Sequence, residues 1–170
     1  CSDADVYRFL KYFTFLEVSE INAIEQDDAA REGRPEAQAV LAREVTRLVH
    51  GEEGLAAAVR ITESLFSGSI EGLAEGDLAQ LRQDGLPASH VSRSQFPETL
   101  TQLLTEVGMA GSGKQVKDAL GRSAVTINSR AVGWDANANV AGCFELSEAL
   151  YGRYYLVKLG KKKYHLFEID

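Results

Sequence analysis

Residues 112–132, SGKQVKDALGRSAVTINSRAV, predict a short helix followed by a β-hairpin. The helix is expected to end at Gly121, since glycine commonly terminates helices. A strand follows over 124–127, the pair Asn128-Ser129 forms a tight turn, and a return strand begins at Arg130. We therefore place this segment in a small domain that combines helix and sheet.

Basic residues of this segment lie on one side of the expected helix. Lys114 and Lys117 are three residues apart, which puts both ammonium groups on one helix face, and Arg122 follows at the helix end. Such a helix can lie along a nucleic-acid backbone, where phosphates supply most of the affinity. An ordinary solvated helix face explains these three residues equally well.

The C-terminal stretch GRYYLVKLGKKKYHLFEI, residues 152–169, predicts two strands joined by a turn at 160–163. Either Tyr154 and Leu156 or Tyr155 and Val157 would face inward before the turn. The turn and its flank form a compact cationic tip, made of Lys158, Lys161, Lys162 and Lys163. These lysines favour a negatively charged ligand, although lysines also protect sheet edges against aggregation.

Composition limits the possible classes of protein. The 170 residues allow one large domain or two small ones, and the net charge of −7 argues superficially against nucleic acid. The charge is unevenly distributed, however: residues 1–110 hold 9 Lys/Arg against 19 Asp/Glu, whereas residues 111–170 hold 9 against 6. A local patch governs attraction to phosphates within a Debye length of ~8–10 Å.

Signals for cellular location are few. No apolar run approaches transmembrane length, and no signal-peptide pattern is present, so no membrane contact is expected. The chain begins at Cys1 without a methionine and resembles a piece of a longer protein. Cys1 and Cys143 are too few for a disulfide framework, which favours a reducing cytoplasm, and Cys143 is expected to be a packing residue.

The first half of the chain shows helical periodicity. Helices are expected to begin after Asp3 or Asp5, near Ser19, at Pro35 and at Glu52, with a shorter one over 70–83. Two of them have clear apolar stripes. The first helix is expected to bury Val6, Phe9, Leu10 and Phe13. The third, which ends at Gly51, is expected to bury Val40, Leu41, Val45, Leu48 and Val49.

The outer faces of these two helices carry basic residues. They are Arg8 and Lys11 on the first, and Arg43, Arg47 and His50 on the third. The second group has the spacing i, i+4, i+7 and so forms a stripe on one helix face; its alternative explanation is pairing with Glu36 or Glu44. Residues 87–97 turn polar without periodicity. We therefore predict an α+β protein with an all-α domain over 1–88, a linker over 89–96 and a second domain over 97–170.

Residues 108–114, GMAGSGK, match the glycine and lysine spacing of a phosphate-binding P-loop. Gln115 follows, however, where serine or threonine must hold Mg²⁺, and the preceding segment is helical, whereas a P-loop follows a strand. Cysteine and histidine spacings suggest no nucleophile and base. We therefore expect no catalytic residue and no metal site in this chain.

Four segments together resemble the bacterial tyrosyl-tRNA synthetases. DADVYRFLKYFTFL (3–16) and VTRLVHGEEGLAAAVRITESLFSGS (45–69) are similar to the helical region after that family's catalytic domain. QVKDALGRSAVTIN (115–128) and the stretch 152–169 are similar to its C-terminal domain, which shares its fold with small-subunit ribosomal protein number four. The runs LVHGEEGL and GKKKY are the most specific.

This resemblance implies that the chain grips the anticodon stem and the long variable arm of tyrosine tRNA. The family attaches tyrosine with ATP and Mg²⁺, works as a cytoplasmic homodimer, and keeps its catalytic signatures ahead of the part seen here. The resemblance therefore implies no cofactor in this chain, tyrosine tRNA and not DNA as its partner, and a monomer for this piece alone.

The family's basic contacts fall on the lysines already described, and its anticodon contact at the start of the first helix falls on Asp3. Relatives often carry arginines at 114, 117 and 158–159, so bidentate phosphate recognition is less available here. The complete set of candidate RNA-contacting residues is Asp3, Arg8, Lys11, Arg43, Arg47, Lys114, Lys117, Arg122, Lys158, Lys161, Lys162 and Lys163. Two alternatives remain: a free-standing RNA-binding protein with the C-terminal fold, and a helical protein-interaction module.

Overall fold

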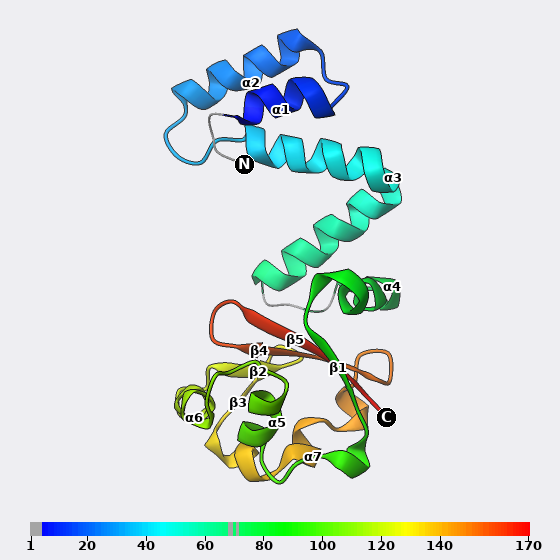
Figure 1. Cartoon of the computed structure of the whole chain (residues 1–170), viewed down its shortest axis with the longest axis vertical. Coiled ribbons are helices and arrows are strands. Elements are labelled where there is room, and N and C mark those ends of the chain that lie inside the picture. Colours follow the sequence, from blue (N-terminus) through cyan, green and yellow to red (C-terminus); the bar gives the residue numbers. More distant parts are fainter. Residues whose placement is uncertain (1–4, 68–69, 71) are drawn as a thin grey trace. The chain divides into compact units, whose positions relative to one another are not determined.

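The computed structural model describes residues 5–67, 70 and 72–170, so the predicted role of Asp3 lies outside the described residues. Two compact units make up the chain: an N-terminal unit, Cys1–Arg60, and a C-terminal unit, Ile61–Asp170. Helices form the first part, and a small sheet with helices forms the second (Figure 1). The α+β fold class predicted from the sequence is confirmed.

The N-terminal unit contains α1 (Val6–Phe13), α2 (Val18–Ala30) and the first part of α3 (Ala37–Ser67). Asp28 connects all three helices. Its carboxylate accepts hydrogen bonds from the backbone N–H of Glu36 (2.7 Å) and Ala37 (3.0 Å) and from the Tyr7 hydroxyl (3.1 Å). The Glu36 N–H, with these other donors, holds the pKa of the Asp28 carboxyl below its usual value.

The third and fourth predicted helices follow one another directly in α3. They are separated by Gly51 alone, which has φ of +71°. Residues with a β-carbon rarely adopt this conformation, so glycine permits the change of backbone direction without strain. The predicted helix end at Gly51 is thus a kink between two helical stretches.

The inward stripes predicted for the N-terminal helices are only partly correct. Val6 and Leu10 of α1 form a small core with Ile21 and Ala37. By contrast, Phe13 of α1, and Leu48 and Val49 of α3, are exposed. The apolar stripes of α1 and α3 extend beyond the region where these helices pack against one another and against α2. Periodicity alone does not show where this packing ends.

The described residues of the C-terminal unit form a five-stranded sheet with the order β1-β5-β4-β2-β3. The strands are β1 (Ala88–Val91), β2 (Val125–Ile127), β3 (Arg130–Val132), β4 (Tyr154–Leu159) and β5 (Lys163–Ile169). Neighbours are antiparallel, except that β1 runs parallel to β5. Both predicted hairpins are present, and Asn128 and Ser129 have the positive φ of a tight hairpin turn.

Helices and short turns cover this sheet. They are α4 (Glu75–Gln80), the π-helical turn η1 (Leu81–Gly85), α5 (Leu100–Glu106), α6 (Gly113–Gly121) and α7 (Val140–Cys143), with 3₁₀ turns η2 (Arg93–Gln95), η3 (Trp134–Ala138) and η4 (Leu146–Glu148). None of the helices in the described part of the chain is long and apolar enough to cross a membrane.

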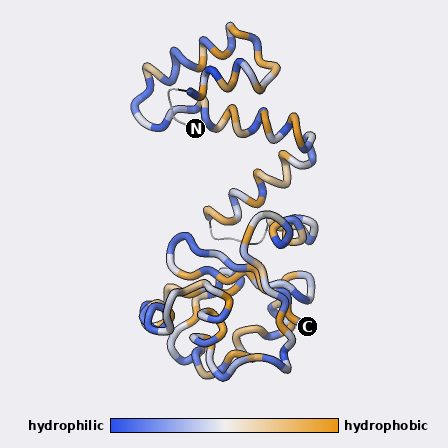
Figure 2. The backbone as a smooth tube through the Cα atoms, viewed as in Figure 1, coloured by the Kyte–Doolittle hydropathy of each residue, from blue (hydrophilic) through white to orange (hydrophobic). Residues whose placement is uncertain are grey.

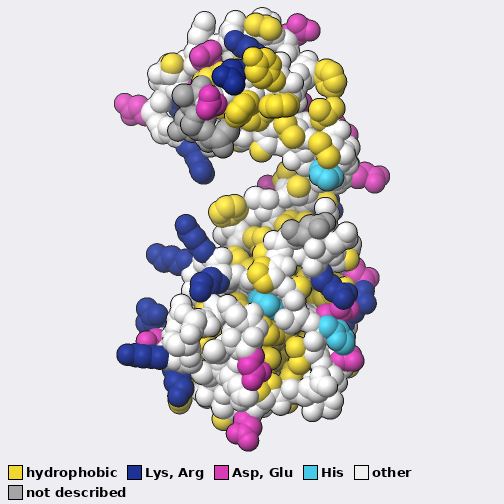
Figure 3. Space-filling model, viewed as in Figure 1, with side chains coloured by type: hydrophobic (Ala, Val, Ile, Leu, Met, Phe, Trp, Pro, Cys, Tyr) yellow, Lys and Arg dark blue, Asp and Glu magenta, His cyan; other side chains and the backbone are white. Residues whose placement is uncertain are grey.

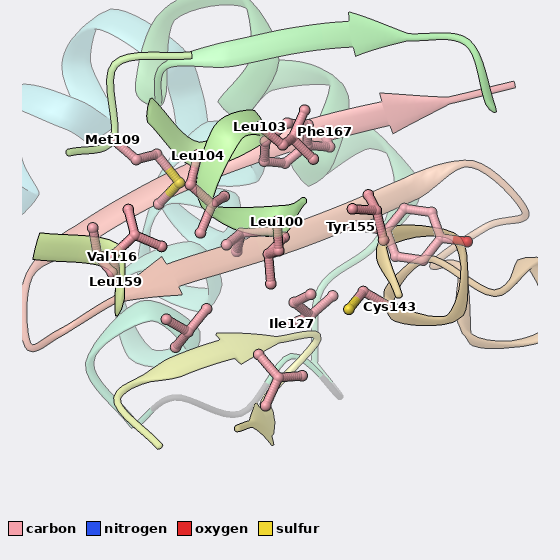
Figure 4. Packing of buried hydrophobic residues seen from close by; sticks show 14 of the residues in the cluster. Leu100, Leu103, Leu104, Met109, Val116, Ile127, Cys143, Tyr155, Leu159 and Phe167 are labelled. Carbon is pink, nitrogen blue, oxygen red and sulfur yellow. The ribbon is translucent and has the colours of Figure 1, made fainter. Parts of the chain in front are cut away.

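Both faces of the central strands are buried, so the two alternatives for the inward residues of β4 are both correct. Tyr155, Val157 and Phe167 belong to a large cluster that includes the leucines of α5 (Figure 4). Tyr154 and Leu156 belong to a second cluster on the other face, with Leu78 and Leu81. The turn between β4 and β5 is hydrophilic by contrast (Figure 2). A sheet packed on both faces gives the hairpin a rigid base.

The compact units divide at Arg60, earlier than the predicted linker over 89–96. Ala88–Val91 is an edge strand paired with β5, and Arg93–Gln95 is a 3₁₀ turn. The strand has one half-buried side, where Ser89 shares a 3.0 Å hydrogen bond with the buried ring of His165. A short, half-exposed edge strand tolerates polar residues, which explains why this segment has the composition of a linker.

Candidate nucleic-acid interface

Helix α6 presents two lysines to solvent. Ser112 caps its N-terminus, since the Ser112 hydroxyl accepts a hydrogen bond from the backbone N–H of Gln115. The helix buries Val116, Ala119 and Leu120 in the core of the unit. Lys114 and Lys117 are exposed, as the spacing predicted. The buried stripe fixes the rotation of α6, so these two ammonium groups are held on its solvent side.

The β4–β5 turn presents two more. Gly160 has φ of +66°, and its N–H donates to the carbonyl of Ala124 at 2.8 Å, which attaches the turn to the residue that precedes β2. Lys161 and Lys162 follow at the tip and are exposed. Their charges therefore stand on a fixed backbone with little side-chain packing.

The other two lysines of the predicted tip have partners. Lys163 is the first residue of β5, and its Nζ donates to the carbonyl of Met109 at 3.1 Å. Lys158 is half-buried, with Nζ 5.2 Å from the centre of the Tyr164 ring. The Lys163 bond places the tip beside the loop that leads into α6. The predicted cluster thus divides into two accessible lysines and two that also stabilise the fold.

Lys and Arg side chains gather over the β4–β5 turn and α6 on one side of the C-terminal unit (Figure 3). Arg122, at the end of α6, donates through Nε to the carbonyl of Asp118 at 3.1 Å and remains exposed. We define the cationic edge as Lys114, Lys117, Arg122, Lys161, Lys162 and Lys163. Two segments separated by about forty residues in the chain are thus brought together, as the C-terminal charge imbalance suggested.

Three arginines elsewhere in this unit are engaged with carboxylates, whereas Arg93 donates to the Tyr155 hydroxyl at 3.2 Å. Arg82 pairs with Glu168 at 2.7 Å, Arg130 with Glu148 at 2.6 Å, and Arg153 with both Glu75 and Glu168. Within the described part of the chain, no ion pair involves a lysine of the cationic edge. The unneutralised positive charge of the unit is therefore concentrated at this edge, where it can attract an anion.

The candidate basic residues of the N-terminal unit lie on α1 and α3. Arg47 pairs with Glu44 at 2.6 Å and with Glu52 at 2.9 Å, and Arg43 lies 3.8 Å from Glu36. The pairing considered as the alternative for this stripe is thus present. Arg8 stacks on the Tyr12 ring, 5.8 Å from its centre, and Lys11 is exposed.

One residue beside the cationic edge escaped the sequence analysis. Trp134, in η3, is 54% exposed, and η3 packs against α5 and α6. Asn137 of the same turn accepts hydrogen bonds from the Thr101 backbone and hydroxyl, and it lines a polar hollow of about 370 Å³ together with Lys117. A lone tryptophan in a polar segment was the available signal. Aromatic rings beside cations commonly stack on unpaired bases.

The P-loop-like segment lacks the strand that precedes a phosphate-binding P-loop. Helix α5 precedes it, and the Gln115 side chain accepts from the backbone N–H of Gly111 at 3.2 Å. Cys143 is buried, and burial raises the pKa of its thiol to about 11, so it is a packing residue rather than a nucleophile. These groups do not fit a nucleotide-hydrolysing or thiol-dependent site.

A helical unit is followed by a small mixed-sheet unit with a cationic edge, an arrangement that suits contact with a polyanion. Comparison with known families specifies it further. Residues 77–167 match the family model of the tyrosine–tRNA ligase SYY-like C-terminal domain, and residues 1–67 match that of the class I tRNA synthetases (W and Y). The chain belongs to the tyrosine–tRNA ligase family, and the resemblance noted in the sequence is confirmed.

Curated relatives support this assignment along nearly the whole chain. The tyrosine–tRNA ligase of Aliivibrio fischeri strain MJ11 is 48% identical over 166 residues, which cover 98% of this chain and 37% of the relative. That of Klebsiella pneumoniae is 47% identical over 165 residues, or 97% of this chain and 37% of the relative. The chain therefore spans a little over a third of the length of these relatives.

Proposed function

We propose that this chain is the tRNA-binding part of a tyrosine–tRNA ligase. It would hold the anticodon stem and long variable arm of tyrosine tRNA while a catalytic region attaches tyrosine with ATP. The observation that carries this proposal is the cationic edge on α6 and the β4–β5 hairpin, whose lysines form no ion pair with any described residue, in a member of this family. Phosphate contacts of this kind position an RNA without reading its sequence.

Several further features belong to the same proposal. ATP and Mg²⁺ would be bound by the part of the relatives that this chain does not match, because the P-loop-like segment does not fit them. The full-length protein would be a cytoplasmic homodimer, this piece alone a monomer, and its partner tRNA rather than DNA or a membrane. Asp3 and the basic residues of α1 would approach the anticodon end.

A gel-shift titration tests the proposal. Tyrosine tRNA, a second tRNA of similar length and a DNA duplex are titrated with the 170-residue chain at a fixed salt concentration. We expect tyrosine tRNA to bind most tightly. Equal affinity for all three would leave only non-specific attraction, and no binding would favour the protein-interaction alternative.

Replacing Arg43 and Arg47 by Ala should weaken tRNA binding less than removing two lysines from the cationic edge. The two guanidinium groups are already opposed by Glu36, Glu44 and Glu52, so little net charge is available to phosphates. Exposed pairs of this kind contribute roughly 0–1 kcal/mol each, so the thermal midpoint should change little. An equal or larger loss of affinity in the same titration would mean that the RNA depends on the N-terminal unit at least as much as on the cationic edge.

Tyrosine tRNA should quench the tryptophan fluorescence of the chain. Trp134 is its single tryptophan, is 54% exposed, and lies in a turn that packs on α6, so bound RNA at the cationic edge would contact or approach the indole. The quenching should saturate with the same dissociation constant as the gel shift and weaken as salt rises. If tRNA binds without any change in tryptophan emission, the bound RNA does not lie beside α6.

A further inference from the structure

A polar hollow of about 370 Å³ lies in the C-terminal unit between α5, the start of α6 and the turn η3. Every described residue that lines it is polar or glycine, and three of them are threonines. Of these lining residues, Lys117 is the only cation and Glu106 the only anion. Contact with RNA phosphates accounts for the lysine but not for a carboxylate in the same wall. The polar hollow therefore suits a ligand that has hydrogen-bond donors as well as acceptors.

Helix α5 turns its two faces to different surroundings. Leu100, Leu103 and Leu104 point into the core (Figure 4). Gln102 and Glu106 lie one turn apart on the exposed face, and the Gln102 amide donates to Oε1 of Glu106 at 2.8 Å. No described residue donates to the other carboxylate oxygen, Oε2. The carboxylate is thus held by a neighbour on its own helix and can still accept hydrogen bonds from a ligand.

Asn137 is held in one orientation at the polar hollow. Its Oδ1 accepts from the backbone N–H of Thr101 at 3.0 Å and from the Thr101 hydroxyl at 2.6 Å. Because a backbone N–H can only donate, the amide oxygen must face Thr101 and the amide nitrogen must face away from it. Among the described residues, nothing accepts a hydrogen bond from Nδ2. This half-buried amide therefore has N–H donors that are available to a ligand.

The turn η3 adds an aromatic surface next to Asn137. Residues three apart in a 3₁₀ turn lie on the same side of it, so Trp134 and Asn137 leave η3 on one side. The indole of Trp134 is 54% exposed. Exposed aromatic rings of this kind stack on bases of single-stranded RNA. A surface for stacking thus accompanies the donors and acceptors of the polar hollow.

We propose that the polar hollow binds the base of a single unpaired guanosine in the RNA. One edge of guanine carries the carbonyl oxygen O6 beside two N–H donors, at N1 and at the N2 amino group. Nδ2 of Asn137 would donate to O6, and the carboxylate of Glu106 would accept from N1 and N2. Lys117 would contact the phosphate of the same nucleotide, which joins this site to the cationic edge.

Other occupants satisfy these groups less well. A phosphate inside the polar hollow would be repelled by the Glu106 carboxylate. Adenine and cytosine each present one amino group, and uracil presents one ring N–H, so none of them offers a carboxylate two donors on adjacent atoms. A volume of about 370 Å³ lies near the low end for pockets that hold small ligands, which suits one base. Proteins that read RNA sequence commonly take such an unpaired base.

This inference rests on the proposed function, because it names the part of an RNA that the C-terminal unit would distinguish. The cationic edge by itself would position an RNA without reading its sequence. A guanine-binding hollow beside that edge would add a preference for one nucleotide at one place along the bound strand.

Fluorescence anisotropy with labelled six-nucleotide RNAs can measure this preference. The probes are hexauridylate and three variants of it whose fourth nucleotide is guanosine, adenosine or cytidine, each titrated with the 170-residue chain at one salt concentration. The guanosine RNA should bind about tenfold more tightly than the other three, a ratio typical of one good two-bond contact to a base. Equal affinities for the four RNAs would overturn the proposal.

Free guanosine monophosphate, added as a competitor, distinguishes RNA from a free nucleotide as the source of the base. It should displace the guanosine RNA only at roughly millimolar concentration, because it lacks the neighbouring phosphates that the cationic edge would contact. Displacement at micromolar concentration would make a free nucleotide the ligand and would overturn the assignment to RNA.

Glu106→Gln and Asn137→Asp test the two sides of the site. Glu106→Gln keeps an oxygen for Gln102 but removes the carboxylate, and Asn137→Asp keeps both bonds to Thr101 but removes the N–H donors. Each variant should reduce the guanosine preference to about twofold or less, with a nearly unchanged thermal midpoint. A change in charge alone would shift the affinities for all four RNAs together and leave their ratio intact. An unchanged ratio in Glu106→Gln would overturn the proposal.

Glu98→Gln is the matched control. Glu98 is exposed, lies in the same unit and does not line the polar hollow, so this variant makes the same change in charge as Glu106→Gln outside the site. It should keep the tenfold guanosine preference of the unchanged chain. An equal loss of preference in Glu98→Gln would show that the effect does not come from the polar hollow.

Affinity for tyrosine tRNA is measured on the same samples. If the chain binds tyrosine tRNA but shows no guanosine preference, the proposed function stands and the guanine site fails. If it prefers the guanosine RNA but does not bind tyrosine tRNA, the guanine site stands and the proposed function fails. The two ideas can therefore fail separately.

Discussion

Replacing Lys114, Lys117, Lys161 and Lys162 together by Ala should lower the affinity for tyrosine tRNA by about two orders of magnitude near physiological salt. Each phosphate contact contributes ~0.7–0.9 to the slope of log K against log salt, so four contacts should make that slope shallower by roughly 3 units. All four side chains are exposed, and no described residue forms an ion pair with them. The thermal midpoint should therefore remain nearly unchanged.

The structure improves this choice of residues over the three adjacent lysines of the tip. Lys163 donates to the carbonyl of Met109, so its removal would also affect the fold. The matched control is Arg82→Ala with Arg130→Ala, two charges that are already paired with Glu168 and Glu148. For each charge removed, this double arginine variant should change the slope of log K against log salt much less than the quadruple lysine variant does. If the control and the lysine variant had equal salt slopes, the lysines of the cationic edge would not contact phosphates. They would then serve only to protect the sheet edge against aggregation and to keep the protein soluble.

Affinity for a non-cognate tRNA should fall by a similar factor in the lysine variant. Ammonium groups contact phosphates as point charges and do not distinguish bases. Specificity, measured as the ratio of the two affinities, should therefore survive. A selective loss for tyrosine tRNA would mean that these lysines contact bases or a feature of shape particular to that RNA.

Local signals explain what could be predicted from the sequence. The hairpin at Asn128-Ser129 was predictable because its turn needs two residues with positive φ, which narrows the choice of residue types. The rotation of α6 was predictable because its apolar positions leave one face for Lys114 and Lys117. Both features depend on residues close together in the chain, and the second places two side chains of the cationic edge.

Contacts between distant segments explain what was missed. Lys163 looks like its neighbours in the sequence, and only the folded chain brings the carbonyl of Met109 to it. Strand β1 was read as a linker because its partner, β5, lies more than seventy residues away. Val49 was predicted to be buried because it lies on the apolar stripe of its helix, yet it is exposed. Periodicity identifies apolar positions but does not show whether another part of the protein covers them.

Phe144→Ala should destabilise the C-terminal unit by about 3–5 kcal/mol, the usual cost of truncating a buried aromatic residue. Phe144 is fully buried, and its ring lies 5.2 Å from that of Tyr155 and 5.6 Å from those of Phe96 and Phe167. Its carbonyl also accepts the Tyr155 hydroxyl at 3.0 Å. The loss should be measured by urea titration followed by circular dichroism, with Phe66→Ala as the control, since Phe66 is 87% exposed.

The control should change the free energy of unfolding by no more than about 0.5 kcal/mol. At a temperature where Phe144→Ala remains folded, its tRNA affinity and salt slope should match those of the unchanged chain, because Phe144 lies in the core and not at the cationic edge. The lysine variant should show the opposite pattern, with intact stability and a shallower slope. A shallower slope of log K against log salt for Phe144→Ala would contradict this expectation. It would mean that packing of the core around Phe144 determines the positions of the lysines at the cationic edge.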